Sequence, residues 1–288
     1  MGSGIPCVSF RAWLEWRRTF QWDSQEDDKS TRLDDGESAV IAYLSPARNM
    51  QPGALPEGIP STPRYLGKTK RIIDALKNCQ PWQFESLLKL GPELAWNAFA
   101  RHQDFDLNRP GVPALLAYQG LAFLHLNARD FTKEDFDFAE RHLRIASALY
   151  GLLAPKDGIQ PYRLELRCKF RVDGQSLYRF WGDTVYKDLF ASGAPVINLA
   201  SREYAQLVTP FLHPADNWIT CDFMTPVRGK LKTLPSRAKM ARGEMARFMV
   251  KNRLENPEDL KRFSRDGYRF AEGISTSSRF VFIQHGEG

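Results

Sequence analysis

Three acidic residues stand in loops where carboxylates could do acid–base chemistry. Glu165 follows a Gln-Pro-Tyr-Arg turn, Asp183 follows a Phe-Trp-Gly run, and Glu203 comes just past an apolar segment. Paired carboxylates can divide the roles of general acid and general base, or hold a divalent cation, when the fold brings them together. Ion pairs with Arg163 and Arg202 are the alternative, in which the acidic residues only stabilise their loops.

His142 is a fourth candidate for a catalytic role. Helical spacing places it on an apolar face near Phe138. A single histidine in such a place is more often a buried group with a hydrogen-bond partner than a general base. The catalytic interpretation stays open beside this structural one.

The other histidines and the cysteines show none of the spacings that hold metal ions. The sequence contains no H-x-x-x-H pair and no C-x-x-C pair. Scattered cysteines are typical of a reducing cytoplasm and argue against a disulfide framework. We therefore expect a cytoplasmic protein with no metal site and no bound cofactor. The residues concerned are His102, His125, His213, His285, Cys7, Cys79, Cys168 and Cys221.

A second kind of chemistry, phosphate binding, is indicated at residues 81–101. The pattern predicts two short helices joined by a turn that contains Lys89 and Gly91, with Arg101 in the second helix. Backbone N–H groups at such a turn, and at the start of the next helix, can hold a DNA phosphate without reading sequence. Plain packing of a helical hairpin is the alternative.

A third stretch, residues 237–254, predicts an amphipathic helix with a basic flank. Lys239, Arg242 and Arg253 fall together beside its apolar face, and small Ala246 lies between them. This arrangement favours contact with nucleic acid, although a helix that is merely solvated by its basic side chains fits the same pattern. Two loop arginines complete the candidate set for phosphate binding, namely Arg48 and Arg163.

Charge is distributed unevenly along the 288 residues, whose formal net charge is +6. Residues 21–38 carry seven acidic and two basic side chains, whereas residues 225–253 carry nine basic side chains and one acidic. Such asymmetry favours a polyanionic partner. No apolar run reaches the roughly 18 residues of a membrane-spanning helix, so we expect no membrane partner.

Apolar patterning predicts the elements that must position these residues. Buried strands are expected at 40–44, 114–118, 195–200, 218–224, 230–234 and 279–283. Helices are expected between them, including one that Thr132 caps and that continues to about Gly151, since Phe138, Ile145 and Leu149 recur at helical spacing. Because strands and helices do not alternate regularly, the prediction is an α+β fold: a single mixed domain with a helix-hairpin-helix-like element.

Residues 1–38 are interpreted as an appendage to a domain at residues 39–288. Their second half is polar and acidic, which is typical of a flexible, disordered N-terminal extension. The alternative is a mis-assigned start, in which Val40 is the true initiator, translated from a GTG codon.

Several motifs resemble the YaaA peroxide-stress protein family, and the resemblance covers about Val40 to the C-terminus. They occur in the expected order: LSPAR (44–48), FDFAERHLR (136–144), LYGLLAP (149–155), QPYRLE (160–165), FWGD (180–183), NLASREY (198–204), AKMARG (238–243) and NRL (252–254). The family pattern has Lys where this chain has Arg48, and Asn where it has Ala98. The resemblance implies a DNA-binding protein with a helix-hairpin-helix, which supports defence against hydrogen peroxide by lowering free iron.

The first hypothesis for function is a binder of double-stranded DNA without sequence specificity and without an obligate protein partner. The alternative is an enzyme that hydrolyses a nucleotide, nucleobase or damaged DNA in a glycosylase-like reaction through Glu165, Asp183 and Glu203. A third is a protein of iron homeostasis that does not contact DNA. Convergence of the three carboxylates beside Arg163 would favour the enzyme, whereas an open face shared by Lys89 and Lys239 would favour the binder.

Overall fold

The computed structural model describes residues 40–51, 60–109 and 111–285 of the chain. All of them belong to one compact unit, Glu37–Gly288. The predictions for residues 1–38 lie outside the described residues, and the division of the chain at residue 38 stays a prediction.

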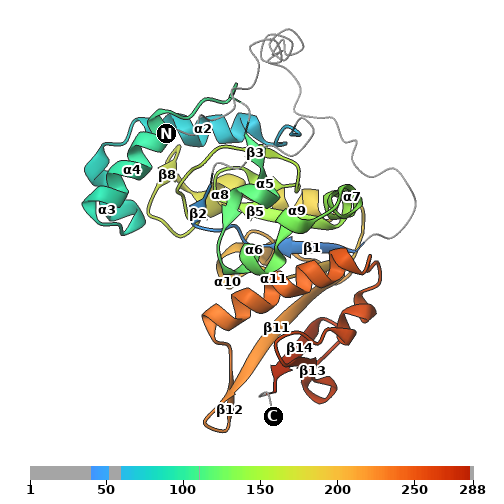
Figure 1. The fold of residues 1–288 in the computed structure, drawn as a ribbon. Coiled ribbons are helices and arrows are strands. Elements are labelled where there is room, and N and C mark those ends of the chain that lie inside the picture. Colours follow the sequence, from blue (N-terminus) through green and yellow to red (C-terminus); the bar gives the residue numbers. More distant parts are fainter. Residues whose placement is uncertain (1–39, 52–59, 110, 286–288) are drawn as a thin grey trace, which may run out of the picture. The chain divides into compact units, whose positions relative to one another are not determined.

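One mixed sheet forms the centre of this unit (Figure 1), in the order β13-β14-β11-β10-β1-β5-β6, with β12 paired to β11. The five inner strands run parallel. The outer strands β13 and β6 run antiparallel to their neighbours. The mixed α+β class is as predicted. The bounds are β1 Ile41–Leu44, β5 Leu143–Ser147, β6 Gly151–Leu153, β10 Val196–Asn198, β11 Trp218–Val227, β12 Lys230–Lys232, β13 Tyr268–Phe270 and β14 Arg279–Gln284.

The strand β1 lies in the middle of the sheet. All four of its residues are buried, which fits the rule that parallel strands covered on both faces read as continuous apolar runs. Ile41 is in register with Val196 of β10, and Ala42 is in register with Leu143 of β5. The predicted strands at 40–44, 195–200, 218–224, 230–234 and 279–283 are all present, with small shifts of their ends.

The helix predicted from Thr132 is shorter than expected. Its cap is confirmed, because the Asp135 N–H donates to Thr132 Oγ1 (3.2 Å) and the Thr132 N–H donates to the Asp135 carboxylate (3.0 Å). However, the helix α7 (Lys133–His142) ends at His142, and the chain enters β5 at once. The predicted continuation was wrong because the apolar residues after His142 belong to a strand, buried except at Arg144, that pairs with β1.

The segment predicted as a strand at 114–118 also differs. Ala114–Ala117 makes one helical turn, α5, and only Tyr118–Gln119 is extended, as β4. A short apolar run fits a buried helical turn as well as a strand. The strand β4 pairs with β2 (Asn49–Met50). Further short strands are β3 Val112–Pro113, β7 Gly158–Ile159, β8 Arg171–Val172 and β9 Gln175–Ser176.

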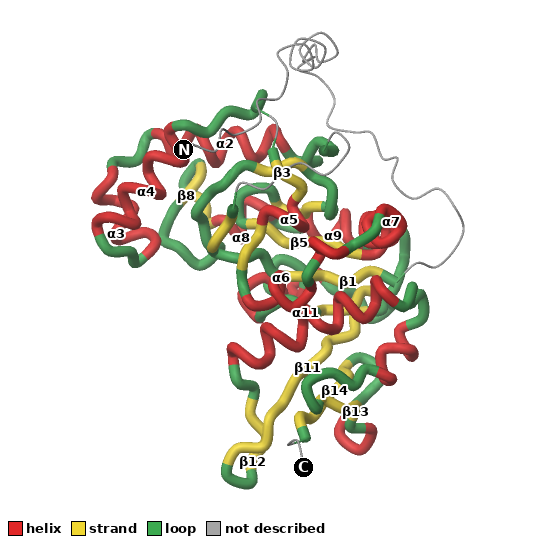
Figure 2. Tube along the Cα trace, in the orientation of Figure 1, coloured by secondary structure: helices red, strands yellow, loops and turns green. Residues whose placement is uncertain are grey.

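Helices flank the sheet, as the red segments of Figure 2 show. The longest described helix, α11 (Pro235–Lys251), packs against α6 (Leu121–Leu126), α7 and β11. The other α-helices are α2 Leu66–Lys77, α3 Pro81–Leu88, α4 Pro92–Gln103, α8 Leu177–Trp181, α9 Thr184–Leu189 and α10 Arg202–Ala205. Short 3-10 turns are η1 Ala128–Asp130, η2 Thr209–Phe211, η3 Pro257–Arg262 and η4 Glu272–Ile274.

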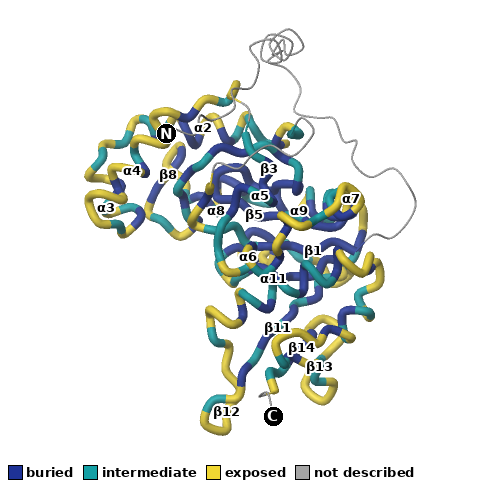
Figure 3. The backbone as a smooth tube through the Cα atoms, viewed as in Figure 1, coloured by how far each residue is buried: buried dark blue, intermediate teal, exposed yellow. Residues whose placement is uncertain are grey.

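Burial is greatest along the parallel strands and the helix faces against them (Figure 3). Among the described residues, no helix is long and apolar enough to cross a membrane.

Candidate functional site

The loops that follow β1 and β10 meet at one edge of the sheet. Ser45 Oγ accepts a hydrogen bond from the Ser201 N–H (2.8 Å) and lies 3.2 Å from Ser201 Oγ. The Tyr43 hydroxyl donates to the Tyr204 carbonyl (3.0 Å). Neighbouring parallel strands end at the same edge, which is where α/β sheets commonly hold ligands. This edge therefore brings together motifs that are more than 150 residues apart in the chain.

Two arginines contact Glu165 at this edge, and a third acts on one of them through its charge. Arg48 Nη2 lies 2.7 Å from the Glu165 carboxylate, and Arg163 Nη2 lies 3.5 Å from it. Burial lowers the pKa of the Arg163 guanidinium, and the nearby charges of Arg48 and Arg101 lower it further. Arg101 is in the last turn of α4. We call Arg48, Arg101 and Arg163 the arginine cluster.

Within the arginine cluster, Arg163 is the most enclosed member. Its side chain is 18% exposed, against 67% for Arg48. Its Nη1 donates to the Arg48 carbonyl (3.3 Å), whereas its buried Nε has no hydrogen-bond partner among the described residues. A half-buried guanidinium beside the exposed one of Arg48 gives the sheet edge a positive charge that can attract an anionic group.

Two of the three predicted carboxylates lie at this edge. Burial raises the pKa of the Cys168 thiol and of the Tyr204 hydroxyl, and the charges of both Glu165 and Glu203 add to the two increases. A carboxylate oxygen of Glu203 accepts from the Arg167 N–H (3.3 Å). The structure thus places Glu165 and Glu203 around the same two side chains.

The third carboxylate, Asp183, has other partners. It stands before α9 and pairs with Lys187 one turn later (2.8 Å). The hydrogen bond from Lys187 lowers its pKa, and nearby Lys68 also contributes. Of the two arginines that were predicted to pair with the carboxylates, Arg163 pairs with Glu165. Arg202 is exposed.

His142 lies at the opposite end of β1 from the arginine cluster. Its Nδ1 donates to the carbonyl of Val40 (2.9 Å), and its ring stacks on Phe138 with centroids 3.9 Å apart. Burial lowers the pKa of the imidazole. These contacts support the structural interpretation, in which His142 ties the end of α7 to the start of β1.

The helices α3 and α4 are joined by a turn of three residues, as the spacing predicted. Lys89 adopts a left-handed conformation (φ 53°) at the end of α3, and Gly91 precedes α4. Both are exposed. Two tryptophans on this hairpin are also exposed, Trp82 at 66% and Trp96 at 58%. Whether the hairpin is a DNA-binding helix-hairpin-helix stays a prediction.

The expected basic flank of α11 is only partly open. Lys239 is exposed and has no ion pair among the described residues. Arg242 is half-buried beside Cys221 and Asp222, and burial lowers the pKa of its guanidinium. Arg253 pairs with Asp135 (2.7 Å) and lies over the ring of Phe138.

A set of basic residues that the candidate list missed lies on the β11–β12 hairpin. Arg228 and Gly229 form its two-residue turn, with φ of 51° and 75°, which suits the tight turns of β-hairpins. Arg228, Lys230 and Lys232 are exposed, and their side chains form no hydrogen bond or ion pair with other described residues. We call these three residues the basic ribbon. The excess of basic residues at 225–253, which includes these three, was the feature of the sequence that indicated them.

The comparison with protein families gives a clear match. The family model of the peroxide stress protein YaaA matches residues 40–273. The chain belongs to the YaaA peroxide stress protein family. It is also similar to UPF0246 proteins of Agathobacter rectalis (38% identical, covering 83% of this chain and 96% of the relative) and Clostridioides difficile (36% identical, covering 85% and 100%).

Three of the motifs that carry the likeness to YaaA proteins meet at the arginine cluster. LSPAR supplies Ser45 and Arg48, QPYRLE supplies Arg163 and Glu165, and NLASREY supplies Glu203. Because these motifs come together only in the folded chain, the sheet edge is the best candidate for the functional site of this YaaA protein. Arg48 keeps the positive charge of the Lys in the YaaA pattern, but a role that needs a titrating Lys amine is not available to it.

Proposed function

We propose that this YaaA protein binds double-stranded DNA through its phosphates, without sequence specificity, and limits iron-driven DNA damage during peroxide stress. The proposal includes a cytoplasmic location and no obligate protein partner. The observation that carries it is the basic ribbon, three exposed cations without described partners on a two-stranded hairpin. A two-stranded β-ribbon fits the DNA major groove, and Lys and Arg on it neutralise phosphates.

The ribbon also has a suitable position. Figures 2 and 3 show β11 leaving the buried sheet and ending in the exposed hairpin with β12. Val227 is in register with Lys230, and Thr225 with Lys232, so the ribbon is short and its cations are close together. Lys239, four residues after the start of α11, adds a further exposed cation on the same stretch of chain.

The arginine cluster and the α3–α4 hairpin offer a second contact. Arg101 on α4 lies near Arg163, and the exposed Lys89 is at the other end of the hairpin. The indole rings of Trp82 and Trp96 could stack on bases that are already unpaired. For this reason a duplex with a bubble belongs in the binding experiment beside a plain duplex.

The binding test is fluorescence anisotropy of both labelled duplexes, titrated with the full chain at several salt concentrations. A phosphate-reading binder loses affinity steeply as salt rises, and the logarithmic slope is about −0.9 for each phosphate contact. Equal affinity for unrelated duplex sequences is expected. Absence of binding to every DNA form would sink the proposal and redirect attention to small nucleotides and to iron.

One observation favours the enzyme as a second candidate. The charges of Glu165 and Glu203 both raise the pKa of Cys168 and of Tyr204. Arg163, whose Nε has no hydrogen-bond partner among the described residues, pairs with Glu165. In a glycosylase-like reaction, one carboxylate would activate water and the arginines would hold phosphates.

The DNA recovered from the titration decides between the two candidates. It is treated with alkali and run on a denaturing gel. Strand breaks or abasic sites that vanish in Glu165→Gln or Glu203→Gln, but persist in the Asp183→Asn control, would establish the enzyme. Intact DNA would argue against a reaction on DNA and favour the binder.

A further inference from the structure

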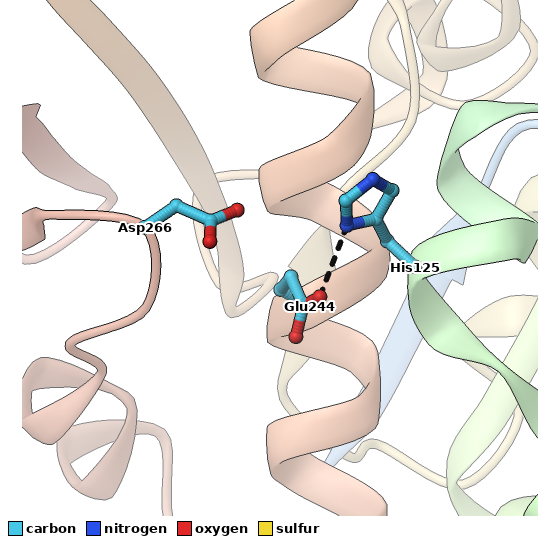
Figure 4. A group of neighbouring side chains, drawn as sticks. All are labelled: His125, Glu244 and Asp266. Carbon is cyan, nitrogen blue, oxygen red and sulfur yellow. Dashed lines mark hydrogen bonds and ion pairs between the residues drawn. The ribbon is translucent and has the colours of Figure 1, made fainter.

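Three side chains of the types that hold metal ions, none of them in the arginine cluster, lie close together (Figure 4). They are His125 of α6, Glu244 of α11 and Asp266 of the loop before β13, and their ligand atoms all lie within 4.8 Å of one another. We propose that these residues form a site for a divalent transition-metal ion such as Zn²⁺. The proposal does not depend on DNA binding.

The packing of α6 on α11 sets the first two ligands. A Cβ atom on Gly243 would lie 2.0 Å from the Ala122 carbonyl oxygen, so only glycine allows the two helices to approach this closely. His125 follows Ala122 by about one turn and therefore faces Glu244. The distance from His125 Nδ1 to Glu244 Oε1 is 3.0 Å.

The third ligand comes from a turn that is tied to the sheet. Asp266 and Gly267 both have positive φ, 49° and 74°. The Asp266 carbonyl accepts from the Gln284 amide (3.0 Å), and the Gly267 carbonyl accepts from the His285 N–H (2.9 Å). The backbone of Asp266 is thus fixed, while its exposed carboxylate points toward Glu244 in Figure 4.

The spacing of the donors fits one ion after a small movement. Tetrahedral metal–ligand bonds of about 2.0–2.2 Å place two ligand atoms about 3.3–3.6 Å apart. His125 Nδ1 and Glu244 Oε1 lie 3.0 Å apart and need to separate by only a few tenths of an ångström. The Asp266 carboxylate, which lies within 4.8 Å of both, can approach by rotation of its own side chain, because it is exposed and forms no side-chain hydrogen bond or ion pair with other described residues.

The chemistry of the donors selects the class of metal. Two carboxylates and a neutral imidazole offer a charge of −2, which a divalent cation balances. An imidazole nitrogen favours transition metals over Mg²⁺ and Ca²⁺. Arg247, which follows Glu244 by about one turn of α11, is occupied by a bidentate contact with Asp130 at 2.7 Å. Three protein ligands leave at least one coordination position to water.

Sequence spacing could not reveal this site. His125 and Glu244 are 119 residues apart, and no short motif joins either of them to Asp266. The sequence therefore predicted no metal site, whereas the fold brings the three ligands together.

The experiment measures metal binding to the full-length protein without DNA, after removal of metal with a chelator. Titration calorimetry with Zn²⁺ is expected to show one ion per chain. Glu244→Gln and Asp266→Asn should each weaken binding about tenfold or more. Glu258→Gln, which removes an exposed carboxylate paired with Lys261, is the matched control and should bind as the wild type does.

Two further readouts separate this site from adventitious binding. Zn²⁺ should raise the melting temperature of the wild type but not of Asp266→Asn, since the ion joins α6, α11 and the loop of Asp266. The absorption spectrum with Co²⁺ should lack a thiolate band, because no cysteine is a ligand. Unchanged affinity in both carboxylate variants, a thiolate band, or no binding by the wild type would overturn the proposal.

Discussion

Asp135 shows how one side chain can join distant parts of the chain. Its carboxylate caps α7 and also accepts from Lys251 (2.6 Å) and Arg253 (2.7 Å) at the end of α11. The side chain is only 6% exposed. Burial alone would raise the pKa of Asp135, but these hydrogen bonds and charges outweigh it and lower the pKa to about 2.

We expect this pairing to make stability depend on pH. The folded pKa of Asp135 lies below its ordinary value of 3.8, so the contribution is present above that value and is lost as the pH falls from about 5 toward 2. A shift of this size corresponds to about 2 kcal/mol at neutral pH. Asp135→Asn should therefore destabilise the protein at pH 7 by about that amount, measured by urea unfolding.

The control for Asp135 is Asp74→Asn, which removes an exposed carboxylate paired with Lys70. It should change stability by less than about 0.5 kcal/mol at any pH. The difference between Asp135→Asn and the wild type should shrink at pH 3. A difference that stays constant from pH 7 to pH 3 would contradict the assignment.

A second prediction at the residue scale concerns α11. If Arg242 contacted one phosphate, as the basic flank predicted from the sequence implies, Arg242→Ala would lower the magnitude of the salt slope of DNA binding by about 1. Arg242 is half-buried beside Asp222, whereas Lys239 is exposed. We expect Lys239→Gln to lower the magnitude of the salt slope by about 1 on every duplex. Arg242→Gln should lower it less, and sequence-selective loss in either variant would argue against phosphate contact.

At the scale of elements, the basic ribbon gives the sharpest test of the proposed function. Replacing Arg228, Lys230 and Lys232 with Gln should lower the magnitude of the salt slope by about 2.7 if each cation contacts one phosphate. The matched control replaces Lys70, Lys133 and Lys187, three exposed lysines elsewhere, and removes the same net charge. If the two triple variants lose affinity equally, the ribbon is not the contact and only overall charge matters.

The contact between α6 and α11 yields another prediction. Gly243→Ala would place a methyl group against the Ala122 carbonyl, and overpacking of this kind costs about 1–3 kcal/mol. Gly67→Ala in α2 is the control, because nothing lies within 4 Å of the added Cβ. The control should be neutral or slightly stabilising. Thermal unfolding of both variants measures the difference, and equal melting temperatures would mean that the helices can separate without loss.

The elements also show what could be predicted from the sequence. Continuous apolar runs found the buried strands β1 and β10, because burial on both faces leaves a strong signal. β11 was predicted as well, although its buried residues alternate with partly exposed ones. The same rule failed after His142, where one apolar stretch fits both a helix and a strand until its pairing with β1 is known. For the site, family motifs pointed to Arg163 and Glu165. Residues that are distant in sequence but neighbours in the fold, such as His125 and Asp266, could not be predicted, because long-range contacts leave no local sequence pattern.

At the scale of the molecule, charge and the family boundary lead to one more prediction. Residues 1–39 carry five basic and eight acidic side chains, so a chain that starts at Val40 has a formal net charge of +9 instead of +6. We expect this shorter chain to keep the melting temperature of the full chain and to bind DNA at least as tightly at low salt. A large drop in melting temperature would contradict the predicted division at residue 38.

The central place of β1 affects how the chain can fold while it is being made. Both neighbours of β1 are synthesised late, since β5 begins at Leu143 and β10 at Val196. At about 5–20 residues per second, a ribosome needs roughly 8 to 30 s to proceed from β1 to β10. During that interval a fully apolar strand has no complete sheet to join. The nascent chain is thus an expected client of ribosome-associated chaperones, and the sheet can close only after most of the protein has emerged.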